Sequence, residues 1–163
     1  MRGFFYGNNI HPWCEWLKRR DAVIKLSSLL GMETDIVPYS PATWFGATEG
    51  LCGERERGAR CEECFALQLE SAARHAAQDD FDYVCTTLTI SPHKDSGVIN
   101  RLGREKTDAA GVEWIDRIWR KNDGFKLSVA MSRKMDLYRQ NYCGCVYSAR
   151  RAIESDGIHE RSA

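Results

Sequence analysis

The chain has 163 residues, of which 43% are hydrophobic and 28% are charged, and its formal net charge is zero. This length and composition are typical of one soluble globular domain, and they exclude a disordered chain. No apolar run reaches the roughly 18 residues of a membrane span. The N-terminal residues lack the apolar core of a signal peptide, so we expect a cytoplasmic protein without membrane contacts.

The hydrophobic pattern predicts helices alternating with short strands. Helices are expected at 12–30, 59–78, 95–109 and 125–135, with a shorter helix after Ser40-Pro41; Gly31 and Gly111 are expected to close two of them. Strands are expected at 4–6, 34–37, 81–88 and 112–115. This alternation predicts an α/β fold, a single domain with a mainly parallel sheet flanked by helices in a Rossmann-like three-layer arrangement. Ligands of such sheets bind at the carboxyl ends of the strands.

Two of the seven cysteines form a CxxC pair at the start of the helix predicted at 59–78. Cys61 and Cys64 are three residues apart, so they share one helix face. The N-terminal end of a helix favours thiolates, which suits a metal, a cluster or a redox disulfide. Two unconnected core cysteines are the alternative.

A second pair, Cys143 and Cys145, flanks Gly144 in a segment that we expect to be irregular. A CxC pair can chelate one metal or close into a strained, redox-active disulfide. The two pairs supply four thiolates, enough for a zinc site, an iron–sulfur cluster, or a metal pair beside a redox dithiol. We expect the isolated Cys14 and Cys85 to be small buried apolar residues.

Two further stretches carry polar groups. Residues 86–94 place hydroxyls, His93 and Lys94 after a predicted strand, where they can bind phosphate or donate protons. Residues 138–142 combine aromatic rings, Arg139 and amides in a pattern that suits stacking on an unpaired base. The alternatives are a structural histidine and a polar surface loop. Residues 117–139 also hold seven Lys/Arg against two Asp, either a phosphate-binding patch or a solvated face.

Several segments in order and spacing resemble the QueH family of cobalamin-independent epoxyqueuosine reductases. They are ERGARC (56–61) with CF (64–65), TTLTISPHK (86–94) and LYRQNYCGC (137–145), supported by FY (5–6), NIHP (9–12) and KNDGFK (121–126). The resemblance covers about residues 4–148, which we take as the reductase domain, with 149–163 as a C-terminal tail.

The resemblance implies a function and a set of roles. The family reduces the epoxide of epoxyqueuosine at the wobble base of tRNA, using a [4Fe–4S] cluster and an unidentified electron donor. Cys61 and Cys64 match cluster ligands. Cys143 and Cys145 match a redox-active dithiol or ligands of an additional adjacent iron. His93 and Tyr142 are the expected proton donors, and the expected RNA contacts are Lys94, Lys126, Arg139, Gln140 and Asn141.

Family members also carry an upstream strand that ends in an adjacent cysteine pair. The resemblance therefore implies that the domain in this sequence is incomplete at its N-terminus, and we expect low activity from a protein that starts at Met1. Two other functions fit the residues: an RNA-binding domain held by a four-cysteine zinc site, and a thiol oxidoreductase that uses Cys61 and Cys64.

Overall fold

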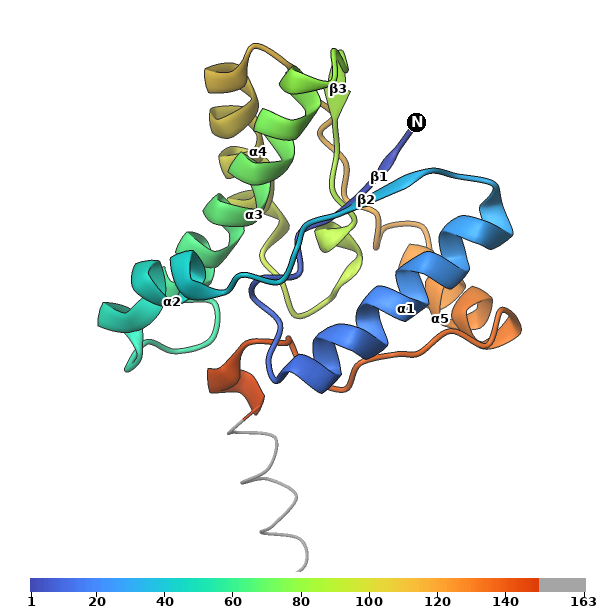
Figure 1. The fold of residues 1–163 in the computed structure, drawn as a ribbon, viewed down its shortest axis with the longest axis horizontal. Coiled ribbons are helices and arrows are strands. Elements are labelled where there is room, and N and C mark those ends of the chain that lie inside the picture. Colours follow the sequence, from blue (N-terminus) through green and yellow to red (C-terminus); the bar gives the residue numbers. More distant parts are fainter. Residues whose placement is uncertain (150–163) are drawn as a thin grey trace, which may run out of the picture. The chain divides into compact units, whose positions relative to one another are not determined.

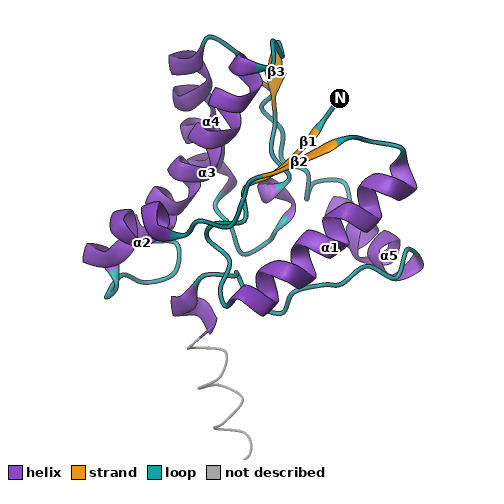
Figure 2. Ribbon diagram, in the orientation of Figure 1, coloured by secondary structure: helices purple, strands orange, loops and turns teal. Residues whose placement is uncertain are grey.

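The structure is a computed structural model that describes residues 1–149. Helices predominate, and each strand is two or three residues long (Figure 2). The helices are α1 (Trp13–Leu30), α2 (Ala42–Thr48), α3 (Ala59–Gln78), α4 (Ser96–Ala110) and α5 (Gly124–Lys134), and the strands are β1 (Gly3–Phe5), β2 (Thr34–Ile36), β3 (Tyr83–Val84) and β4 (Glu113–Trp114).

The predicted helices are confirmed, and the ends of the four long ones lie within one residue of expectation. The glycines expected to close α1 and α4 do so: Gly31 and Gly111 adopt left-handed conformations with φ of 60° and 75°. At the other end of α4, the Asp95 carboxylate accepts hydrogen bonds from the N–H groups of Gly97 and Val98. These local signals fix the helix ends because they satisfy backbone groups that the helix itself leaves unpaired.

The α/β class is confirmed, with parallel strands joined by helices. The expectation of one sheet is wrong for the described residues: the strands pair as two separate parallel sheets, β1 with β2 and β3 with β4. Each pair is a βαβ unit, because α1 connects β1 to β2 and α4 connects β3 to β4 (Figure 1).

The chain divides into two compact units. Of the described residues, the first unit contains Met1–Ala42 together with 134–149, and so includes α1 and both cysteines of the CxC pair. The second unit contains Thr43–Arg133, with Cys61 and Cys64. All but the first residue of the tail predicted at 149–163 lies outside the described residues.

The strand predicted at 81–88 is shorter than expected. Only Tyr83–Val84 forms a strand, and Leu88–Ile90 is a turn of 3₁₀ helix. Thr86 ends the strand: its hydroxyl accepts a hydrogen bond from the Leu88 N–H, and its carbonyl accepts one from the Trp119 indole at 2.8 Å. Hydrogen bonds to side chains compete with the backbone hydrogen bonds that pair neighbouring strands. The residue pattern of 81–88 gives no sign of this competition.

The core of the second unit lies between α3 and α4. Phe65 and Leu69 from α3 meet Ile99 and Leu102 from α4, and Cys61 packs against the edge of this cluster. A second cluster joins the C-terminal half of α3 to the strands through Ala73, Ala76, Val84 and Val112. Burial of α3 on this side therefore fixes the helix whose first turns carry the CxxC pair.

In residues 1–149, no helix combines the length and the apolar composition needed to cross a bilayer.

Candidate functional site

Cys61 and Cys64 lie in the first two turns of α3, as predicted. The Cys61 sulfur accepts a hydrogen bond from the backbone N–H of Arg57 at 3.2 Å. The Cys64 sulfur accepts one from the Gln68 side-chain amide, also at 3.2 Å. Each sulfur thus accepts a hydrogen bond from an N–H group, the kind of contact that metal-ligating thiolates make in proteins.

Arg60 holds the loop that precedes these cysteines. Its side chain is 2% exposed, and its Nη1 donates to the carbonyls of Leu51, Cys52 and Glu54 at 3.1, 3.1 and 2.7 Å. One buried guanidinium therefore anchors three carbonyl groups beside the start of α3. Nothing in the local sequence distinguished Arg60 from the other charged residues of the segment.

The segment 86–94 lies next to the same helix start. The Arg57 guanidinium donates to the carbonyls of His93 and Pro92 at 2.8 and 3.2 Å. Arg120 supports the segment from the other side, donating to the carbonyls of Ser91 and Lys94. The His93 side chain is exposed, and that of Lys94 is half-buried. The second unit thus brings two of the predicted stretches together, the CxxC pair and the segment with His93.

The CxC pair belongs to the first unit, and the residues around it come from the other end of the chain. Cys143 is half-buried and Cys145 is buried. The His11 N–H donates to the Gly144 carbonyl at 2.7 Å, and Arg19 donates to the carbonyls of Tyr142 and Cys143. The Cys145 sulfur lies 3.4 Å from both the amide nitrogen and the hydroxyl of Ser148. The sequence indicated no role for Arg19, and it marked His11 only as part of a family segment, because contacts across more than a hundred residues leave no local pattern.

Comparison with known proteins decides the family. The family model described as epoxyqueuosine reductase QueH matches residues 1–151. The chain belongs to the QueH family. Curated relatives named epoxyqueuosine reductase QueH include one from Histophilus somni, 38% identical over 90% of this chain and 61% of its own length. Another from Thermotoga maritima is 34% identical over 89% of this chain and 77% of its own length.

This QueH chain covers less than two thirds of several relatives. It spans 61% of the Histophilus somni protein and 60% of the Streptococcus pyogenes protein, which is 35% identical to it.

The Tyr142 hydroxyl is a hydrogen-bond donor to the backbone. It donates to the His11 carbonyl, and the Arg19 guanidinium lies 5.3 Å from the centre of the Tyr142 ring. Burial, with a smaller contribution from the charge of Glu15, raises the pKa of Tyr142 to about 12. A phenol with these contacts keeps its proton and anchors backbone; its predicted role as a proton donor stays a prediction.

The residues predicted to contact RNA are divided between the units. Arg139, Gln140 and Asn141 are exposed and directly precede the CxC turn in the first unit. Lys126 belongs to the second unit, where its ammonium lies 2.9 Å from the Asp123 carboxylate. Lys94 belongs to the second unit as well.

Two predictions about isolated cysteines are wrong. Cys14 and Cys85, expected to be buried, are both exposed. Cys14 lies on α1 beside the buried Glu15 and Trp16, so the buried face of the helix begins one residue after it. Cys85 follows the last residue of β3, where the strand ends earlier than expected.

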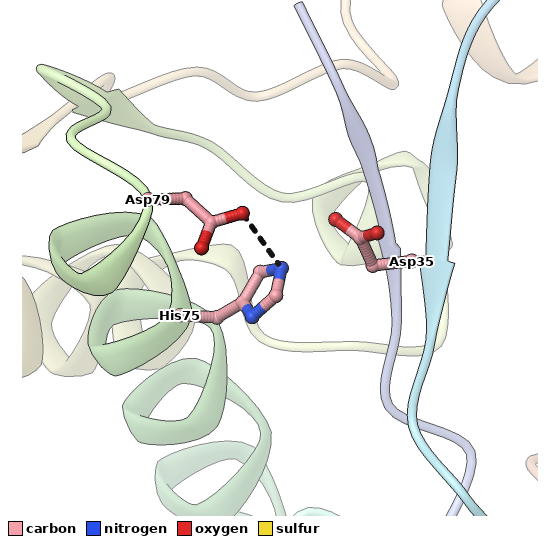
Figure 3. Close-up of side chains that lie close together, drawn as sticks. All are labelled: Asp35, His75 and Asp79. Carbon is pink, nitrogen blue, oxygen red and sulfur yellow. Dashed lines mark ion pairs between the residues drawn. The ribbon is translucent and has the colours of Figure 1, made fainter.

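His75 and Asp79 are titratable side chains that lie close together at the end of α3. Figure 3 shows the His75 ring facing the Asp79 carboxylate, with 3.8 Å between Nε2 and Oδ2. His75 lies in the last turn of α3 and Asp79 is its C-terminal cap. A histidine near a helix C-terminus interacts favourably with the helix dipole, so this pair has a structural explanation.

Proposed function

We propose that this chain carries the activity after which its relatives are named, the reduction of epoxyqueuosine to queuosine, acting on tRNA. The observation that supports the proposal is the family match over residues 1–151. The CxxC pair at the start of α3 and the CxC turn lie within that match, and the sulfurs of Cys61, Cys64 and Cys145 each accept a hydrogen bond from an N–H group.

The reaction removes the epoxide oxygen as water, and so consumes two electrons and two protons. A [4Fe–4S] cluster, when bound, supplies electrons one at a time from an external donor. Cys61 and Cys64 fit such a group, because each sulfur already accepts an N–H hydrogen bond of the kind that tunes cluster thiolates. We assign cluster ligation to these two residues.

Cys143 and Cys145 would serve either as a dithiol, giving two electrons as they form a disulfide, or as ligands for an adjacent iron. The hydrogen bond from Arg19 of α1 to the Cys143 carbonyl supports both roles, because each role requires a fixed backbone between the two sulfurs.

His93 would deliver a proton from the segment 86–94. Arg57 connects His93 to the CxxC pair. Its guanidinium donates a hydrogen bond to the His93 carbonyl, and its backbone N–H donates one to the Cys61 sulfur. Lys94, Lys126, Arg139, Gln140 and Asn141 would bind the RNA through its phosphates and base edges. Thiolate ligands require a reducing compartment, which supports a cytoplasmic location.

The activity is tested with anaerobically purified protein, tRNA carrying epoxyqueuosine, and a low-potential reductant. Mass spectrometry of the digested tRNA should show the modified nucleoside lighter by one oxygen atom. Cys61→Ala should lose both iron and product, whereas Cys143→Ser should keep iron and lose product. The control is Cys52→Ser, an exposed thiol.

Metal analysis of the same preparations separates the competing functions. A broad absorption band near ~400 nm would mark an iron–sulfur cluster. A colourless protein with one zinc per chain and no product would favour the zinc-bound RNA-binding domain. Equal iron loss in Cys61→Ala and Cys143→Ser would show that the assignment of separate roles to the two pairs is wrong.

A further inference from the structure

We propose that Glu15 and Arg19 are positioning residues that hold the Cys143–Cys145 turn in the shape in which both sulfurs can bind one metal ion. The inference rests on the proposed function to the extent that it takes these two cysteines as a functional pair. All of its contacts lie within the first unit.

Three successive carbonyls of the turn accept hydrogen bonds from Arg19 on α1 and from His11, which precedes that helix. Arg19 Nη2 donates to the Tyr142 carbonyl at 3.0 Å, and Nη1 donates to the Cys143 carbonyl at 2.9 Å. The next carbonyl, that of Gly144, accepts the His11 N–H at 2.7 Å. Because three consecutive peptide groups are fixed, the backbone on both sides of the CxC pair has little freedom to rotate.

Glu15 fixes the orientation of Arg19. The Glu15 carboxylate, one helical turn earlier on α1, accepts a hydrogen bond from Arg19 Nε at 2.8 Å. The two side chains are only 6% and 10% exposed. The second Glu15 oxygen accepts the Tyr138 hydroxyl at 2.7 Å. Glu15 therefore orients the planar guanidinium through its Nε atom, and the two terminal nitrogens, Nη1 and Nη2, remain available to the carbonyls of the turn.

The Arg19 guanidinium lies so close to Gly144 that there is no room for a side chain at this position. A Cβ atom on this residue would lie 2.8 Å from Arg19 Nη1, and the residue adopts φ of 118°, which side chains rarely allow. The backbone of the turn and the guanidinium thus meet without an intervening side chain. Such close contact suits a geometric role for Arg19 better than a general contribution of positive charge.

The physical consequence is preorganisation. Two thiolates separated by one residue bind one ion well only if the peptide groups between them are held in one conformation. Groups that orient metal ligands without touching the metal change its affinity by about 10- to 100-fold when they are removed. We expect this range for Arg19 and Glu15.

The test measures how zinc protects each cysteine of the full chain from iodoacetamide, with the labelled peptides resolved by mass spectrometry. Arg19→Gln and Glu15→Gln should raise the free zinc concentration that half-protects Cys143 and Cys145 by about 10- to 100-fold. Protection of Cys61 and Cys64, read in the same samples, should not change. Arg74→Gln, which breaks the exposed Glu70–Arg74 pair with the same spacing on α3, is the matched control.

Arg19→Lys separates geometry from charge. Lysine keeps the positive charge but lacks the two-nitrogen fork, so we expect it to lose protection nearly as far as Arg19→Gln. Wild-type protection in Arg19→Lys would overturn the inference, as would wild-type protection in a folded Arg19→Gln. If Arg19→Gln does not fold, judged by circular dichroism, the nearly isosteric Glu15→Gln decides the question alone.

Three further outcomes would also count against it: equal losses at both cysteine pairs, a loss in Arg74→Gln, or wild-type protein in which zinc protects neither Cys143 nor Cys145. The assay contains no tRNA and no reductant. If the variants weaken zinc protection as expected but the wild-type protein does not convert epoxyqueuosine, the proposed function is refuted and the roles of Glu15 and Arg19 stand. If the protein converts epoxyqueuosine but the variants protect like wild type, only the roles of Glu15 and Arg19 are refuted.

Discussion

The hydrogen bond from Gln68 to Cys64 should affect how tightly the CxxC pair binds a metal. Gln68 Nε2 lies 3.2 Å from the Cys64 sulfur and 3.0 Å from the Cys64 carbonyl, and the sulfur belongs to a residue that is 7% exposed. Gln68→Met keeps the length of the side chain and removes the donor. The sulfur would then have to carry its negative charge with one polar neighbour fewer.

A hydrogen bond to a charged group contributes about 1.5–3 kcal/mol, and we take the lower end because sulfur is a weak acceptor. About 1.4 kcal/mol corresponds to a tenfold change in a binding constant. We therefore expect Gln68→Met to weaken zinc binding at Cys61 and Cys64 by about tenfold. Gln68→Glu should weaken it more, because a carboxylate would repel the thiolate.

Zinc protection from alkylation, resolved for each cysteine, measures this change directly. Gln78→Met is the matched control, since Gln78 lies exposed at the far end of the same helix. Unchanged zinc affinity in Gln68→Met would refute the reasoning. So would an equal loss in Gln68→Met and Gln78→Met, which would point to a general effect on α3.

Three other expectations concern stability and RNA. Arg60→Met should lower the free energy of unfolding by about 3 kcal/mol, because it leaves the carbonyls of Leu51, Cys52 and Glu54 without their buried donor. A denaturant titration measures this change, and an unchanged midpoint would contradict the expectation. Burial lowers the pKa of His11 from 6.5 to about 4. The unfolded chain therefore binds a proton that the folded chain does not, and stability should fall by up to ~3 kcal/mol as the pH drops from about 6.5 to about 4. His11→Gln should remove this dependence, and parallel pH curves for the two proteins would exclude the explanation. Arg139→Gln should reduce the slope of log tRNA affinity against log salt by about one; identical slopes would show that Arg139 makes no phosphate contact.

Local signals made most of the fold predictable from the sequence. The positions of Gly31 and Gly111 and the capping residue Asp95 determine where α1 and α4 begin or end, because they act on groups within one helical turn. The same holds for the placement of Cys61 and Cys64 at the start of α3. The true end of β3 was not predictable, because it depends on a bond from the Trp119 indole to the Thr86 carbonyl.

The surroundings of the CxC turn were equally hidden from the sequence. Glu15 and Arg19 read as an ordinary i, i+4 pair on a helix, a pattern that usually indicates a solvated surface. In the structure this pair is buried and contacts Tyr142 and Cys143. The resemblance to the QueH family predicts roles for the cysteines, whereas only the structure shows which side chains bind the backbone around them.

The division of the chain into an interrupted unit and a continuous one has a consequence for synthesis on the ribosome. Thr43–Arg133 is a single stretch, so its core can form while later residues are still being added. The turn with Cys143 and Cys145 depends on α1, which was made more than a hundred residues earlier. Until that segment emerges, Arg19 lacks the carbonyls of Tyr142 and Cys143, and Glu15 lacks the Tyr138 hydroxyl. During translation, Cys143 and Cys145 are therefore the last cysteines of the described chain to gain their contacts, and until then their thiols are accessible to solvent.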